Sequence, residues 1–266
     1  MTQETGPRSP QKTTYSRRGV LRGDETIGSI TPGSTNSETA NRVNQMDEAQ
    51  ARAALKTQYH RVRLLSLGVG GLILFIALML VNVHSPANPV DQAIWDAFID
   101  IRTGCLNRPV EIFTSGFSVL PDMCYSIVAI VAIGLWRKSW WPAVTIGLSM
   151  ILAPAAMVLV KNIIDRTRPP LIDRLVSETS FSFPSGHATG VAALVVSVYL
   201  AMHAVLSRTA RRVVGMLLAV LAIAVACSRL YVAVHWGTDV LGGLTLGTTV
   251  TCLVYAIFPK ILLPLR

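Results

Sequence analysis

The stretch SRLYVAVHWGTD, residues 228–239, places three chargeable side chains, Arg229, His235 and Asp239, among long apolar runs. His235 and Asp239 are four residues apart, so on one helix their side chains share a face. A carboxylate that accepts a hydrogen bond from one ring nitrogen leaves a lone pair on the other, which suits a nucleophile or a base. We expect a turn near Gly237, or just before His235, to bring Arg229 close. An arginine at membrane depth is costly and indicates a function or an acidic partner.

A second group of residues, FPSGHATG at 183–190, suits the binding of an anion at the start of a helix. Ser185 is a favourable N-cap, and Gly186 lets an anion approach the backbone N–H groups of the first helical turn. His187 follows directly and could give or take a proton. Taken alone this pattern is weak evidence, because Ser-Gly before a helix is usually a cap and a lone histidine is usually structural.

The third group runs from Lys161 to Pro169 and supplies positive charge. If the preceding helix continues, Lys161 and Arg168 lie two turns apart on one face, and Pro169 ends the helix. The cations of this region either bind an anion or pair with nearby acids, and the region alone favours neither. These cations are Lys161, Arg166, Arg168 and Arg174, and the acids are Asp165, Asp173 and Glu178.

Together the three groups predict a phosphate site that carries its own chemistry. Guanidinium and ammonium groups neutralise a phosphoryl group. One imidazole, held by a carboxylate, can attack phosphorus, and the other can protonate the leaving oxygen. No metal-binding pattern accompanies these residues, so we expect neither a metal nor a cofactor.

Membrane helices must position these residues. The chain has 266 residues, of which 51% are hydrophobic and only 15% charged, and its mean hydropathy of +0.48 is too high for an ordinary soluble domain. Apolar windows of about 20 residues recur, the length that crosses a hydrocarbon core. We expect an all-α bundle of six transmembrane helices, at about residues 64–83, 117–136, 141–162, 187–206, 213–232 and 239–258.

The distribution of lysine and arginine predicts the orientation of the bundle. These residues gather before the first span, in the turns at 137–140 and 207–212, and at the C-terminus. Six spans place all four regions on one side. The sequence therefore predicts a multi-pass plasma-membrane protein with both termini in the cytoplasm and the phosphate site at the extracytoplasmic end.

The segments outside the spans have weaker signals. We expect residues 1–48 to be a disordered cytoplasmic tail, 49–63 a helical lead-in and 259–266 a short cytoplasmic C-terminus. The basic tail has no nucleic-acid-binding motif, so no nucleic-acid partner is expected.

The first outer loop leaves two questions open. Residues 90–101 have apolar side chains at roughly helical spacing, and form either an amphipathic helix at the membrane interface or a helix that packs on the bundle. Cys105 and Cys124 could form a disulfide, which the sequence does not decide.

The three groups together resemble the three-part signature of the type-2 phosphatidic acid phosphatase superfamily, which also includes bacterial acid phosphatases and vanadium haloperoxidases. The matching patterns are K-x6-R-P from Lys161 to Pro169, P-S-G-H from Pro184 to His187, and S-R-x5-H-x3-D from Ser228 to Asp239. The resemblance covers roughly residues 64–258. It implies that His235 attacks phosphorus to form a phosphohistidine, that Asp239 orients His235, and that His187 is the general acid. The phosphoryl oxygens would be bound by Lys161, Arg168, Ser185, Gly186 and Arg229.

Six spans favour the membrane lipid phosphatase branch of that family. The expected activity is metal-independent hydrolysis of a lipid phosphomonoester, or of the terminal phosphate of a lipid diphosphate, with the lipid bilayer as the partner. Undecaprenyl diphosphate is favoured by a small margin, because in a bacterium it is hydrolysed at the outer leaflet. The alternatives are phosphatidylglycerophosphate or phosphatidic acid as substrate, a lipid phosphotransferase, and an inactive lipid-binding protein, which the intact histidines argue against.

Overall fold

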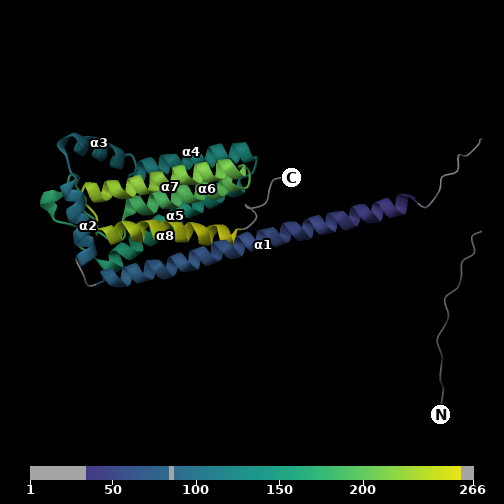
Figure 1. The fold of residues 1–266 in the computed structure, drawn as a ribbon, viewed down its shortest axis with the longest axis horizontal. Helices are drawn as coiled ribbons and strands as arrows, with labels where there is room; N and C mark the ends of the chain where they lie inside the picture. The colour runs from purple at the N-terminus through teal and green to yellow at the C-terminus, as the bar shows by residue number, and fades with distance from the viewer. Residues whose placement is uncertain (1–33, 84–86, 259–266) are drawn as a thin grey trace, which may run out of the picture. The chain divides into compact units, whose positions relative to one another are not determined.

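The computed structural model describes residues 34–83 and 87–258, and within these ranges its regular elements are all helices. Six helices are long and apolar enough to cross a membrane, so the predicted six-span all-α architecture is confirmed. They are α1 (Ser34–Asn82), α4 (Val119–Arg137), α5 (Trp141–Ile164), α6 (Gly186–His203), α7 (Arg208–Tyr231) and α8 (Gly237–Ile257) (Figure 1). The described residues from Glu48 onward form one compact unit.

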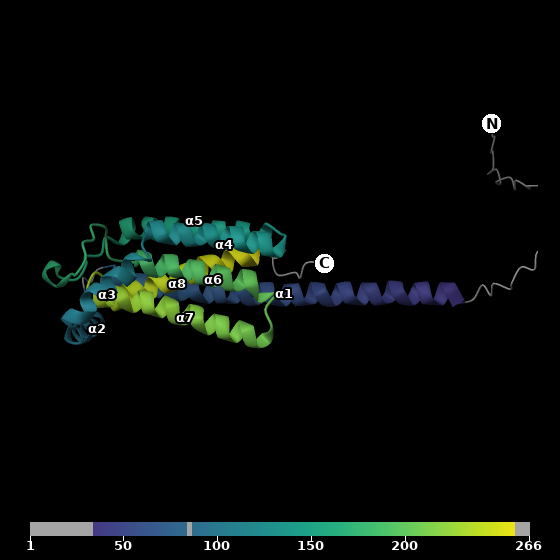
Figure 2. The ribbon, with the colours of Figure 1, turned by 90° about the horizontal axis from the view of Figure 1, so that it is seen from above.

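One end of the bundle carries the connecting helices. There α1, α5 and α7 end and α4, α6 and α8 begin, and the short helices α2 (Pro89–Asp100) and α3 (Gly104–Ser115) lie at the same end (Figures 1 and 2). A single 3-10 turn, η1 (Leu171–Asp173), lies in the loop from α5 to α6. The three sequence groups all fall at or near this end of the bundle.

Helices α6 and α8 form the interior of the bundle and pack closely. A Cβ at Gly247 would lie 2.4 Å from the backbone oxygen of Thr189, and one at Gly243 would lie 2.5 Å from that of Ser185. Glycine at these positions lets the two backbones approach more closely than any other residue would allow. The two helices that begin at the P-S-G-H and H-x3-D patterns are therefore held directly against each other.

The outer helices present large apolar side chains to their surroundings, as a lipid-facing surface requires. Val128 on α4, Leu159 on α5 and Leu217 on α7 are all more than half exposed. Between these helices and α6 lie buried apolar clusters, such as the one that joins Ile133, Ile146 and Ala201.

Helix α1 starts earlier than expected. It begins at Ser34, so residues 34–48, predicted to be disordered, are helical here, and the expected lead-in and first span form one continuous helix. The remainder of the predicted tail and the predicted cytoplasmic C-terminus (259–266) lie outside the described residues.

The structure also decides the two questions of the first outer loop. Helix α2 packs against α7 and α8 and buries Asp91 completely, as the packing alternative requires. Cys105 and Cys124 are both free and exposed, so they form no disulfide.

Candidate active site

His235 and Asp239 meet where α7 is joined to α8. The chain leaves α7 at Tyr231, turns through Ala233 in a left-handed conformation (φ 51°) and reaches His235 just before Trp236, the N-cap of α8. The expected turn before His235 is present, but the prediction that His235 lies on the helix was wrong. The expected contact between the two side chains is nevertheless present. Asp239 is the third residue of α8, and its side chain points back toward the start of the helix, so that Oδ2 lies 3.4 Å from Nδ1 of His235.

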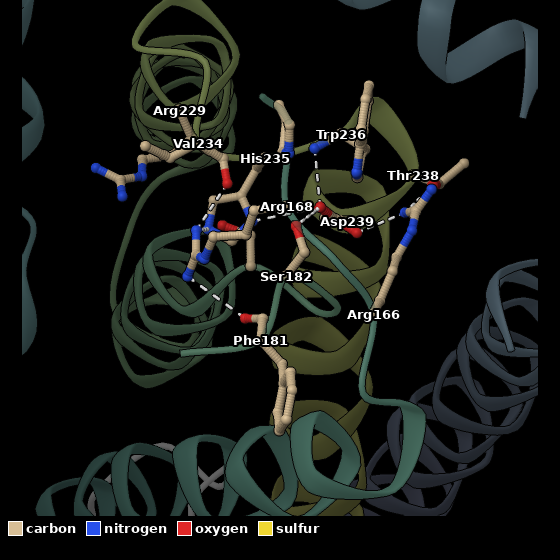
Figure 3. A network of polar contacts seen from close by, with 12 residues as sticks. Arg166, Arg168, Phe181, Ser182, Arg229, Val234, His235, Trp236, Thr238 and Asp239 are labelled. Atoms are coloured by element: carbon tan, nitrogen blue, oxygen red, sulfur yellow. Dashed lines mark hydrogen bonds and ion pairs between the residues drawn. The ribbon is translucent and has the colours of Figure 1, made fainter. Parts of the chain in front are cut away.

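The Asp239 carboxylate is fully buried and held by three further donors (Figure 3). Oδ2 accepts hydrogen bonds from Ser182 Oγ at 2.5 Å and from the Trp236 backbone N–H at 2.8 Å. Oδ1 accepts one from Nη1 of Arg166 at 2.6 Å. The carboxylate is thus fixed in the orientation that faces the imidazole.

Arg166 extends this network to α2. Its Nη2 lies 2.6 Å from Oδ2 of Asp91, and both side chains are almost fully buried. Asp91 also accepts hydrogen bonds from the backbone N–H and the hydroxyl of Thr238, each at 2.8 Å. The sequence left open whether Arg166 binds an anion or pairs with an acid, and the structure shows that it pairs with acids. Its partners are Asp91 and Asp239, and not the acids that are near it in the sequence.

The environment of His235 favours the neutral imidazole. The side chain is 2% exposed. Burial, followed by the positive charges of Arg168, Arg229 and Lys161, lowers the pKa of His235 well below its usual value. Its Nε2 lies 3.3 Å from Nη1 of Arg168 and so faces the cationic cluster (Figure 3). A neutral imidazole whose Nδ1 faces a carboxylate presents its other nitrogen as a nucleophile.

Lys161 and Arg168 converge, but not as two turns of one helix. Helix α5 ends at Ile164, and Asp165 adopts a left-handed conformation (φ 53°) that ends it, so the expected continuation to Arg168 was wrong. Lys161 instead donates to the backbone oxygen of Phe181, and Arg168 donates to the backbone oxygens of Ser180 at 2.6 Å and Val234 at 2.7 Å. The loop before α6 therefore holds both cations beside His235.

Arg229 is paired with an acid from the same loop. Its Nη2 lies 2.5 Å from Oε1 of Glu178, and its Nη1 donates to Thr114 of α3 at 3.0 Å. The other carboxylate oxygen of Glu178 lies 3.6 Å from Nη2 of Arg168. A carboxylate thus bridges the two arginines that the sequence assigns to the phosphoryl group.

Ser185, Gly186 and His187 begin α6 beside this cluster. Ser185 occupies the N-cap position, as expected, yet its hydroxyl makes no capping hydrogen bond, and Oγ is buried without a partner among the described residues. Gly186 and His187 line the cavity described below. An unpaired hydroxyl next to free helix N–H groups is a place for an anion to bind.

A cavity of about 480 Å³ joins the cluster to the apolar interior between α4, α5 and α6. Lys161, Arg168, His187 and His235 line its polar part. The rest is lined mainly by apolar side chains that follow α4 and α5 away from the cluster, including Ile127, Ile130, Met150, Ile151 and Met157. The arrangement suits a molecule with an anionic group at one end and a hydrocarbon chain at the other.

Several residues of this site could not be found from the motifs. Arg166 was noticed only as a loop cation, and Asp91 only as an acid of the outer loop, although the two fix Asp239. Ser182 lies two residues before the P-S-G-H pattern and gave no signal of its own. Within the part of the chain that the structure describes, no three His, Cys, Asp or Glu side chains are grouped as a metal site.

Comparison with known proteins identifies the family of the chain. The family model described as the PAP2 superfamily matches residues 142–262. Phosphatidylglycerophosphatase B of Bacillus subtilis (strain 168) is 34% identical over 201 residues, which are 71% of this chain and 94% of that protein. Decaprenylphosphoryl-5-phosphoribose phosphatase of Mycobacterium tuberculosis (strain H37Rv) is 29% identical over 166 residues, 59% of this chain and 85% of that protein.

A solved structure shows that the likeness extends to the fold. It is the crystal structure of a transmembrane PAP2-type phosphatidylglycerolphosphate phosphatase from Bacillus subtilis, which matches with a TM-score of 0.66 and 29% identity. The match covers 73% of this chain and 96% of that one. With six membrane helices and relatives that are matched over nearly their whole length, the chain belongs to the PAP2 superfamily, in its branch of membrane lipid phosphatases.

Proposed function

We propose that the protein hydrolyses a lipid phosphomonoester through a phosphohistidine formed on His235. One observation carries the proposal: a buried, neutral His235, held at Nδ1 by Asp239, directs Nε2 toward cations at the head of an apolar cavity. The cations attract the phosphate, and the apolar cavity accommodates the lipid chain.

In the first step, Nε2 of His235 attacks phosphorus and a P–N bond forms. The P–O bond to the lipid alcohol breaks, and His187 donates a proton to the leaving oxygen. Asp239 stabilises the positive charge that develops on the His235 ring, as a carboxylate does in other histidine-based sites. The phosphoryl oxygens are bound by Lys161, Arg168, Arg229, the Ser185 hydroxyl and the N–H groups near Gly186.

In the second step, water attacks the phosphohistidine. His187, now neutral, accepts a proton from that water, the P–N bond breaks, and inorganic phosphate leaves. An alcohol in place of water would make the protein a phosphotransferase. Adding glycerol to the assay and measuring glycerol phosphate against free phosphate separates the two activities.

Among lipid substrates we place phosphatidylglycerophosphate first. The support is the Bacillus subtilis phosphatidylglycerophosphatase, which the chain matches over 94% of its length. Undecaprenyl diphosphate, which the sequence favoured on the ground of compartment, is the second candidate, because the apolar cavity also suits a prenyl chain. Phosphatidic acid is the third. We place the reaction at the extracytoplasmic face of the plasma membrane, on the distribution of loop lysines and arginines.

The test is phosphate release by the purified full-length protein in detergent, with each of these lipids as substrate. We expect the highest kcat/KM on phosphatidylglycerophosphate. Release from none of the lipids, under conditions in which the protein is folded, would overturn the proposal.

Metal dependence is tested in the same assay. A site built from guanidinium, ammonium and imidazole groups should keep its activity in excess EDTA, whereas vanadate, which mimics a five-coordinate phosphoryl group, should inhibit. Activity that is lost with EDTA and restored by Mg²⁺ would contradict the proposed mechanism.

A further inference from the structure

Asp122 is a buried acid that the mechanism above does not use. It lies in the first turn of α4, at the end of the bundle that holds the site, and is 6% exposed. Its Oδ1 has no hydrogen-bond partner among the described residues. Ser126, one turn further along, donates to the backbone oxygen of Met123 and does not serve the carboxylate. A buried acceptor without a partner is unfavourable, so it indicates a ligand.

The Asp122 carboxylate lies beside the helix that carries His187. A Cβ at Gly190 would lie 2.4 Å from Oδ2 of Asp122, so glycine at this position makes room for the carboxylate. Gly190 is one helical turn beyond His187, on the same face of α6. Asp122, His187 and Gly190 all line the cavity that also contains His235.

The position of Asp122 relates it to the leaving group rather than to the phosphate. Lys161, Arg168 and Arg229 gather around His235, and an anionic phosphoryl group binds there. Asp122 instead lies beside Gly190, one turn beyond the proposed general acid on α6, and lines the cavity that would hold the departing alcohol.

We propose that Asp122 accepts a hydrogen bond from a hydroxyl of the leaving alcohol, and so selects lipid phosphates that carry a hydroxyl close to the phosphoester. This inference rests on the proposed function. Phosphatidylglycerophosphate has such a hydroxyl on the carbon next to the ester, whereas phosphatidic acid has none. The leaving group of a prenyl diphosphate is a prenyl phosphate, which carries no such hydroxyl.

The experiment compares short-chain phosphatidylglycerophosphate with its analogue that lacks the middle hydroxyl of the terminal glycerol, in wild type and in Asp122→Leu. Wild type should prefer the natural substrate by about 3- to 10-fold in kcat/KM, the effect of one hydrogen bond. In Asp122→Leu the preference should fall to about 1, with kcat/KM on the analogue within about 3-fold of wild type. Activity on the analogue thereby shows that the variant is folded.

Two further variants sharpen the result. Asp122→Asn keeps a carbonyl acceptor at the same position, so it should keep most of the hydroxyl preference. Asp96→Leu makes the same change at an exposed position of α2 and should leave the ratio unaltered.

The outcomes separate the inference from the proposed function. An active wild type without preference for the hydroxyl, or an Asp122→Leu that loses both substrates equally, would overturn the inference and leave the phosphatase function standing. A folded wild type that hydrolyses no lipid phosphate would overturn the proposed function and the inference with it.

Discussion

Four groups hold the Asp239 carboxylate, and they come from two separate parts of the chain. Ser182 and Arg166 come from the loop between α5 and α6, the Trp236 N–H comes from the helix start, and His235 faces Oδ2. With its donors already in place, the carboxylate needs no reorganisation when the His235 ring becomes positive in the transition state. Preorganisation of this kind accounts for a large part of the rate enhancement in many enzymes.

Replacing His235 by alanine should reduce phosphate release to near background, because the nucleophile is lost. Loss of a nucleophile typically costs several orders of magnitude in kcat, about 10⁴-fold or more. The assay is phosphate release from phosphatidylglycerophosphate by the purified variant. His203→Ala is the matched control, because His203 is the last residue of α6, at the other end of the helix, where its ring contacts Tyr199. A His235→Ala variant with more than about a tenth of wild-type activity would contradict the role proposed for this residue.

Glu178 should compete with phosphate for the two arginines that it bridges. Glu178→Gln removes the competing charge, so we expect vanadate and inorganic phosphate to inhibit at roughly 3- to 10-fold lower concentration. Inhibition constants from the phosphate-release assay measure this effect. Glu111→Gln is the control, because Glu111 pairs with Arg108 on α3. Weaker inhibition of Glu178→Gln would show that Glu178 holds the arginines in place rather than competing for them.

The residues with a sequence pattern could be predicted, and those held only by tertiary contact could not. The family signature names Lys161, Arg168, His187 and His235 because their spacing is local. Arg166 and Asp91 are 75 positions apart, and nothing local pairs one with the other. A lone acid such as Asp122 in an apolar stretch gives no indication of which cavity it lines.

At the scale of the elements, the packing of α6 on α8 determines where the proposed catalytic groups lie. Each helix starts at a functional pattern, and the backbone of Ser185 donates to the backbone oxygen of Asp239 at 2.9 Å. Hydropathy predicted where the six spans lie in the sequence, but not the residues at which the helices begin and end. Asp165 and Ala233 adopt left-handed backbone conformations, which cannot be predicted from the spacing of apolar residues. Because the chain turns at these two residues, Arg168 and His235 lie in loops.

Gly247→Ala should destabilise the bundle. The added methyl would lie 2.4 Å from the backbone oxygen of Thr189, and neither backbone can move away cheaply. We expect a loss of about 1–3 kcal/mol, typical of overpacking, measured as a lower thermal unfolding temperature in detergent. Gly70→Ala on α1 is the control, since a Cβ there meets nothing within 4 Å and alanine favours the helix. Equal behaviour of the two variants would mean that α6 and α8 do not need the close approach.

At the scale of the whole molecule, six helices bring the proposed catalytic groups to one end of the bundle. The same end carries α2 and α3. Asp91 of α2 binds Arg166 of the loop between α5 and α6, and Thr114 of α3 accepts a hydrogen bond from Arg229 of α7. The count and the antiparallel order of the spans could be predicted, because apolar windows of membrane length are a strong signal. The roles of α2 and α3 could not, because short amphipathic segments leave their packing partners unspecified.

The sidedness of the protein can be tested by cysteine labelling in intact cells. In a chain from which Cys105 and Cys124 have been removed, a membrane-impermeant thiol reagent should label a cysteine placed at Leu171, which is 74% exposed. The reagent should reach one placed at Thr209, also exposed, only after the membrane is broken. The expectation follows from the positive-inside rule. The reverse pattern would place the site in the cytoplasm and exclude a reaction at the outer leaflet.

The long separations within the site have a consequence for biosynthesis. Asp91, made early, accepts a hydrogen bond from the backbone N–H of Thr238, 147 residues later, and Asp239 lies in the sixth span. A nascent chain with five spans inserted already has the cations of the loop between α5 and α6, but it lacks both members of the His235–Asp239 pair. We therefore expect catalysis to begin only when α8 has entered the membrane and docked on α6, so that activity itself reports completed insertion.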